Sequence, residues 1–248
     1  MKGHEKMRDV VDLHTHTIAS GHAYNTIQEM VRAARERNLE IYGITEHAPA
    51  MPGTCTSMYF QNLEVLPRER EGMTVLFGAE LNILDFDGHV DLPERVLAKL
   101  DFAIASMHSP CFQSGSLQEN TTAYRKVMEN PLISIIGHPD DGRYPVDYDV
   151  LAKEAARNQV ILEMNNSSLA PGSYRENAAK NYRIMLAACK KYRTPVIIDS
   201  DAHVDLDVGN HSLALQLLGE VDFPEELLIN AHPELLKKYL NYYRNNYK

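Results

Sequence analysis

The feature that most constrains this chain is a series of histidine and acidic residues, each at the end of an apolar run. The first is Asp12-Leu13-His14-Thr15-His16, which ends the run that begins at Val10. Side chains alternate faces along a strand, so His14 and His16 are expected on one side, able to hold one metal ion, with Asp12 below them on that face. Later apolar runs end in the same residue types, roughly thirty residues apart, which is the length of one strand-helix-strand unit. They end at His47, Glu80, His108, His138, and Asp201 with His203.

This spacing predicts one metal site assembled from the same ends of many parallel strands. The apolar runs predict seven strands, over a segment beginning at Val10 and over 41–45, 73–81, 102–107, 132–137, 160–164 and 195–198. Helices are expected over 26–38, 59–66, 93–100, 121–129, 150–157, 177–192, 212–218 and 233–243, and a tight turn at 87–88. Parallel βα units that close on themselves bring every strand end to one face, which predicts an α/β fold of the TIM-barrel type. The alternative, an open doubly wound sheet, would spread the ligands along a line.

Length and composition limit the classes of protein. The 248 residues show no repeat or linker and are expected to form one domain over 1–248. A net charge of −9 argues against a broad basic surface for nucleic acid or anionic membrane. Three cysteines without C-x-x-C spacing favour a reducing compartment. The first eight residues lack an apolar signal-peptide core, and no run approaches membrane-spanning length, so a cytoplasmic protein is expected.

The residue types favour catalytic rather than structural ions. Structural zinc sites are usually rich in cysteine, whereas this set is nearly all histidine with two carboxylates. Imidazole with carboxylate suits zinc, manganese or iron, and sequence does not choose among them. An isolated histidine is more often an ordinary polar residue, but seven of the eleven histidines stand at or just beyond expected strand ends. Of the other four, His4 is expected to be terminal and solvated, and His232 to lie at the start of the last helix. His89 and His211 are expected at the surface, with the mouth of the site as the alternative.

The motifs together resemble the PHP (polymerase and histidinol phosphatase) superfamily over nearly the whole chain. The similar segments are 12–16, Thr45-Glu46-His47, Gly78-Ala79-Glu80, Ser106-Met107-His108, Gly137-His138-Pro139 and Ser200-Asp201-Ala202-His203. The compact length, the segment 163–168 and Val221-Asp222-Phe223-Pro224 are most similar to the YcdX-like phosphatases. The resemblance implies a distorted (β/α)7 TIM-like barrel, the PHP fold. It also suggests a homo-oligomer such as a trimer.

For the site, the resemblance implies three divalent metal ions per chain, usually described as zinc. His14, His16, Glu80 and Asp201 would hold one ion, and Glu80 would bridge to a second ion held by His108 and His138. His22, His47 and His203 would hold the third.

The resulting hypothesis is hydrolysis of small phosphate monoesters by a metal-bound hydroxide, which needs no serine or cysteine nucleophile. Glu80, Asp201 and His203 are the expected catalytic residues, and Arg175, Asn166 and Ser167 are candidate contacts to the substrate. Three alternatives stay open: a histidinol-phosphate phosphatase, a PHP-type nuclease or phosphodiesterase, and a metal-binding module without catalytic activity.

Overall fold

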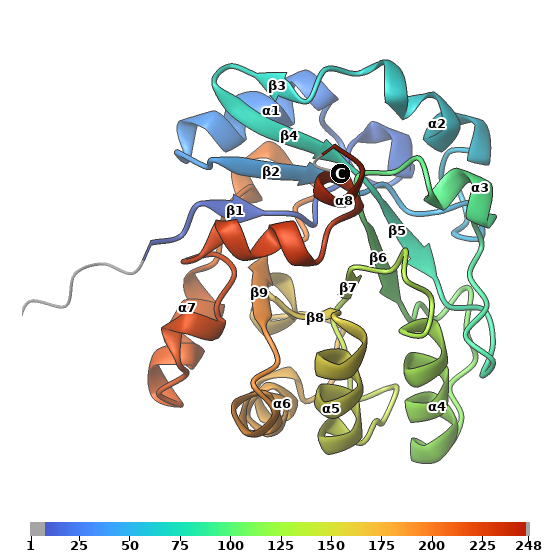
Figure 1. The fold of residues 1–248 in the computed structure, drawn as a ribbon, viewed down its shortest axis with the longest axis vertical. Coiled ribbons are helices and arrows are strands. Elements are labelled where there is room, and N and C mark those ends of the chain that lie inside the picture. Colours follow the sequence, from blue (N-terminus) through green and yellow to red (C-terminus); the bar gives the residue numbers. More distant parts are fainter. Residues whose placement is uncertain (1–7, 247–248) are drawn as a thin grey trace, which may run out of the picture.

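The computed structural model describes residues 8–246, which form a ring of parallel strands with helices outside it (Figure 1). One sheet contains β1 (Val11–Asp12), β2 (Ile41–Ile44) and β4 (Met73–Phe77), and the antiparallel β3 (Glu69–Arg70) pairs with β4 at its edge. The second sheet runs in order through β5 (Ala79–Asn82), β6 (Ala103–Ser106), β7 (Ile135–Ile136), β8 (Ile161–Asn165) and β9 (Val196–Asp199). Every pairing apart from β3–β4 is parallel.

Isolated bridges join the two sheets into a barrel. A parallel bridge between His47 and Glu80 continues the pairing past β2, and another between Thr15 and Ala202 brings β1 beside β9. The prediction of one continuous strand over 73–81 is wrong in one respect. The segment divides into β4 and β5 around Gly78. A Cβ at Gly78 would lie 2.7 Å from the carbonyl oxygen of Phe102, so no larger residue fits at this division. If β4 and β5 are counted together as one strand of the barrel, there are seven parallel units, as in a distorted seven-stranded barrel.

Helices follow the strands in the expected alternation. They are α1 (Ile27–Glu36), α2 (Ser57–Asn62), α3 (Glu94–Leu97), α4 (Leu117–Val127), α5 (Tyr148–Asn158), α6 (Ala178–Tyr192), α7 (Ser212–Glu220) and α8 (Asn241–Asn246). Short 3₁₀ helices are η1 (Ile18–Ser20), η2 (Leu63–Val65), η3 (Asn166–Leu169), η4 (Asp205–Asp207), η5 (Glu225–Leu227) and η6 (Pro233–Lys238). Figure 1 shows α4, α5 and α6 side by side outside the strands.

Local capping explains where two of these helices begin. Thr26 and Glu29 form the expected capping box at the start of α1. A second capping box, between Ser116 and Glu119, starts α4 earlier than the expected Thr121. The expected helix over 233–243 is also wrong as a single element, since η6 and α8 are separate.

The core has two layers because strand residues alternate between two faces. Ala103, Ala105 and Leu162 belong to the larger apolar cluster that also contains buried residues of the outer helices. Ile104 and Ile161, on the opposite face, belong to a smaller cluster inside the barrel. This inner cluster takes residues from all seven units and the C-terminal segment: Val11, Leu13, Ile41, Leu76, Phe102, Ile104, Ile135, Ile161, Ile197, Ile229, Leu236 and Leu240.

The C-terminal segment closes the end of the barrel at which the strands begin. Ser134, just before β7, donates its hydroxyl to the carbonyl oxygen of Tyr239, and the amide of Tyr242 donates to the carbonyl oxygen of Asp101, before β6. The opposite end, where the strands finish, therefore holds the histidines and carboxylates. No helix within residues 8–246 has the length and apolar character needed to span a membrane.

Candidate active site

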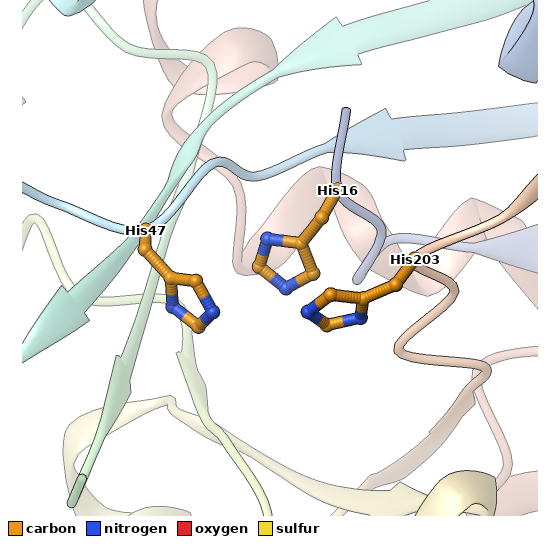
Figure 2. Close-up of side chains that lie close together, drawn as sticks. All are labelled: His16, His47 and His203. Carbon is orange, nitrogen blue, oxygen red and sulfur yellow. The ribbon is translucent and has the colours of Figure 1, made fainter. Parts of the chain in front are cut away.

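Seven histidines converge at the strand ends of the barrel. Figure 2 shows three of them, His16, His47 and His203, whose rings face one another from three separate segments of chain. The ring centroid of His16 lies 4.3 Å from that of His47 and 4.4 Å from that of His203. His22, which is exposed, lies 4.9 Å from both His47 and His203. Of the other three, His14 has its ring centroid 5.2 Å from that of His16, and the centroids of His108 and His138 are 5.1 Å apart.

Glu80 lies at the centre of this group. Its Oε1 is 3.3 Å from His14 Nε2, 3.1 Å from His108 Nε2 and 3.0 Å from His138 Nε2. Its Oε2 is 3.5 Å from His16 Nε2 and 2.7 Å from His47 Nδ1. Burial by itself would raise the pKa of Glu80, but the surrounding imidazoles hold that pKa well below its ordinary value. Glu80 is thus an ionised carboxylate that contacts five histidines.

Asp201 is the second carboxylate of the group. Its Oδ1 lies 3.6 Å from His14 Nε2 and 3.3 Å from His16 Nε2. Asp201 and His138 both have positive φ angles, 56° and 29°, which are uncommon for residues other than glycine. Asp201 is held in this conformation by its amide, which donates to the carbonyl oxygen of His14 at 2.9 Å. Such backbone strain concentrates at functional sites.

Hydrogen bonds at Nδ1 orient four of the imidazoles. His14 Nδ1 meets Glu163 Oε1 at 2.6 Å, and His108 Nδ1 meets Asn82 Oδ1 at 2.8 Å. His203 Nδ1 lies 2.9 Å from the carbonyl oxygen of Asp201. These partners are acceptors, so with a metal ion on Nε2 each Nδ1 would carry the proton and donate it to its partner.

His16 is oriented through a longer chain. The hydroxyl of Ser20 donates to Glu46 Oε2 at 2.6 Å, so its oxygen is free to accept the proton on His16 Nδ1 at 3.0 Å. Asn82 is fixed in a similar way, because its amide donates to Asp91 at 2.6 Å. Carboxylates and carbonyls that hold the far nitrogen of a histidine are the usual support of a metal ligand.

The donor set fits bound metal ions. His14 Nε2, His16 Nε2, His47 Nδ1 and Glu80 Oε2 are buried and lack hydrogen-bond partners, although they face one another. Three overlapping groups have ligand atoms mutually within 4.8 Å: His14, His16 and Asp201; His16, His47 and His203; and His47, Glu80 and His108. Burial lowers the pKa of His108 to about 4, which favours the neutral form that binds metal. The division of these ligands among three ions stays a prediction, because the groups share His16 and His47.

A cavity of about 230 Å³ opens onto these residues. Arg175 lines it, and its guanidinium donates to Asp201 Oδ2 at 2.8 Å and to the hydroxyls of Ser167 and Ser168 at 3.0 and 3.1 Å. Ser167 therefore contacts Arg175 but does not itself line the cavity. Of the three expected substrate contacts, Arg175 is the one that lines the cavity.

Asn166 does not have the position expected for a substrate contact. It is buried, and its Oδ1 accepts the amides of Leu213 and Ala214 at 3.0 and 3.1 Å. These are free amides of the first turn of α7, so Asn166 caps that helix from another part of the chain. It is also absent from the cavity lining.

The expectation that His211 lies at the surface is wrong. His211 is 2% exposed rather than at the surface, with Nδ1 2.8 Å from Asp9 Oδ1 and Nε2 3.9 Å from Asp12 Oδ2. Asp12 is buried and its carboxylate accepts the amides of Ser200 and Gly209; its place below His14 and His16 stays a prediction. His89 is exposed as expected, His232 is partly exposed, and His4 lies outside the described residues.

Several residues of the site were missed in the sequence. Glu163 and Asn82 support the histidines, and Arg143 and Tyr174 line the cavity. For Glu163 a signal was available, since it is a charged residue inside an otherwise apolar strand. Arg143 and Tyr174 lie in loops, where no periodic pattern distinguishes a cavity residue from a solvated one.

A parallel barrel with histidine and carboxylate ligands converging at its strand ends defines a metal-dependent hydrolase. Residues 12–170 match the family model described as PHP domain. A probable phosphatase of Clostridium novyi is 42% identical over 234 residues, which cover 94% of this chain and 95% of that protein. A probable phosphatase of Caldanaerobacter subterraneus is 43% identical over 241 residues, covering 97% and 94%. The chain belongs to the PHP family, as an enzyme of the phosphatase class.

A solved structure has the same fold. It is histidinol phosphate phosphatase from Lactococcus lactis, complexed with zinc, L-histidinol and phosphate, with a TM-score of 0.61 and 18% identity. The match covers 87% of this chain and 95% of the other. At this level of identity the likeness concerns the barrel.

Proposed function

We propose that this enzyme hydrolyses small phosphate monoesters at a centre of three divalent metal ions, with zinc as the first candidate and manganese or iron as the others. The observation that carries the proposal is the position of Glu80, whose two oxygens contact five imidazoles beside a cavity lined by Arg175. A single carboxylate with this many histidine neighbours is suited to bridging ions. The cavity volume is below that of typical drug-sized ligand sites, which supports a small substrate.

When bound, the ions would supply positive charge for the phosphoryl oxygens and would lower the pKa of a water molecule towards neutrality. The residues that would hold them are His14, His16, His22, His47, Glu80, His108, His138, Asp201 and His203. The chain supports these ligands with hydrogen-bond partners for Nδ1 of His14, His16, His108 and His203, which would hold the Nδ1 proton while Nε2 binds an ion.

Arg175 has the second role in the mechanism. Its guanidinium is oriented by Asp201, Ser167 and Ser168, and it lines the cavity beside the ligands. A guanidinium fixed in this way suits a phosphoryl oxygen, because its planar N–H groups match the spacing of two oxygens. We therefore assign Arg175 to orientation of the phosphoryl group and to stabilisation of its charge during transfer.

The test combines metal analysis with a substrate panel. Mass spectrometry of the purified enzyme is expected to show about three ions per chain, and chelation is expected to abolish phosphate release from small esters until metal is restored. The panel includes histidinol phosphate and a labelled oligonucleotide. Exclusive turnover of either one would replace the general monoesterase by a histidinol-phosphate phosphatase or a nuclease. Less than about one ion per chain after reconstitution would contradict the metal centre itself.

The surroundings of the enzyme are also part of the proposal. Cys55, Cys111 and Cys189 are all free, which fits a reducing compartment, and we propose a cytoplasmic location. Assembly into a trimer stays a prediction, to be tested by light scattering.

A further inference from the structure

The cavity contains a second arginine, Arg143, which the proposed chemistry does not use. Arg143 and Arg175 both line the cavity, but their environments differ. Arg175 is buried and bonded to the ligand Asp201, whereas the side chain of Arg143 is 31% exposed. Two arginines in one small cavity of a protein with net charge −9 indicate a local preference for anions.

Arg143 is held firmly, yet part of its guanidinium remains available. Nε lies 3.0 Å from both oxygens of Asp141, Nη2 lies 2.5 Å from Asp141 Oδ2, and Nη1 donates to the Ser109 hydroxyl at 3.0 Å. A guanidinium carries five N–H groups. These contacts use one on each nitrogen, so a second N–H on each of Nη1 and Nη2 is left for a ligand.

The ion pair between Arg143 and Asp141 is asymmetric. The side chain of Asp141 is only 3% exposed, whereas that of Arg143 is 31% exposed. Both residues line the cavity, but the guanidinium is by far the more exposed group of the pair. The pair therefore presents mainly its cation to solvent.

The ring of Tyr174 lies close to both arginines. The Cζ of Arg175 lies 5.4 Å from the centroid of the Tyr174 ring, and that of Arg143 lies 4.8 Å from the same centroid. Arg175 contacts the ligand Asp201, so it belongs to the inner part of the site. Arg143 instead bonds to Asp141 and Ser109, neither of which is an expected metal ligand.

We propose that Arg143 binds a carboxylate on the leaving group, so that the preferred substrates are small phosphate monoesters of hydroxy acids. This inference rests on the proposed function, in which Arg175 and the ions take the phosphoryl group. The leaving group must then extend from the inner site towards Arg143. The free N–H groups on Nη1 and Nη2 provide charge-assisted hydrogen bonds for its carboxylate.

The test compares two substrates that differ in the carboxylate, 2-phosphoglycolate and ethyl phosphate. For the metal-loaded enzyme we expect kcat/KM to be about tenfold or more higher for 2-phosphoglycolate, mainly through KM. Arg143→Gln is expected to bring this ratio close to one, and Arg143→Lys to retain part of it. The matched control is Arg157→Gln, on the outer helix α5, where the side chain is 76% exposed and the ratio should not change.

Each other outcome contradicts a defined part of the argument. A wild-type ratio near one, or a ratio that survives in Arg143→Gln, overturns the carboxylate site but leaves the phosphatase intact. A parallel loss on both substrates with a lower melting temperature means that Arg143 only stabilises the turn at Asp141. If the metal-loaded enzyme hydrolyses neither substrate nor any other monoester, the proposed function fails instead.

Discussion

Glu163 provides the sharpest test of how the metal ligands are supported. It is fully buried, accepts the Nδ1 proton of His14 at 2.6 Å and accepts the amide of His138 at 2.5 Å. Glu163→Gln keeps the size of the side chain but leaves one carbonyl oxygen for these two donors. The side-chain NH2 of the glutamine must then face either the imidazole or the backbone N–H. Both of these groups are donors, so one of them loses its acceptor.

The expected effects on metal binding and stability follow from this count. Loss of a supporting partner commonly weakens metal affinity by about 10- to 100-fold, which corresponds to about 1.4–2.7 kcal/mol. A buried donor without an acceptor costs about 1–3 kcal/mol in the free energy of unfolding. The affinity is measured by competition with a chromophoric chelator, and the stability by urea unfolding of the metal-loaded enzyme.

The control for this experiment is Glu220→Gln, which removes an exposed carboxylate paired with Arg183. It should leave metal affinity unchanged, because Glu220 contacts no ligand of the centre in the described chain. If Glu163→Gln bound metal as tightly as the wild type, orientation of His14 by Glu163 would be refuted.

Three further predictions concern other parts of the molecule. Glu80→Gln should lose metal and phosphatase activity together, as read by metal analysis and phosphate release; full activity with intact metal content would contradict the bridging role. Asn166→Ala should lower the free energy of unfolding by about 1 kcal/mol through the lost cap of α7, whereas lost activity with unchanged unfolding would favour the substrate contact expected from sequence. Burial alone would lower the pKa of His211, but Asp12 and Asp9 raise it from 6.5 to about 10. Because the pKa is raised on folding, the charged His211 stabilises the fold fully below about pH 6.5, and this stabilisation is lost as the pH rises towards 10. Between about pH 7 and about pH 9.5, the free energy of unfolding in urea should therefore fall more for the wild type than for His211→Gln. Equal losses would show that His211 is not charged.

The barrel and the convergence of its ligands could be anticipated because both follow from local patterns. Strand ends marked by His47, His108 and His138 recur with the period of βα units, and parallel units place such ends on one face. The capping box of Thr26 and Glu29 likewise lies within four residues, so the sequence displays it directly. The division of the third strand at Gly78 could not be read in this way, since it depends on the carbonyl oxygen of Phe102, just before the neighbouring strand β6.

The features that the sequence did not predict share a physical cause, which is partners distant along the chain. Asn166 caps a helix that begins 46 residues later, at Ser212. His211 is buried because Asp9 and Asp12, about two hundred residues away, provide charge partners that an isolated histidine would lack.

The sequence by itself determined which side chains meet, because strand periodicity and ligand chemistry are local properties of the chain. Only the tertiary structure decided how those side chains are held: which carboxylate orients His14, which nitrogen of each imidazole keeps its lone pair, and which arginine faces the cavity. These are consequences of packing between segments that are remote in sequence. Their energies depend on burial and on distances of a few ångströms, which no local pattern encodes.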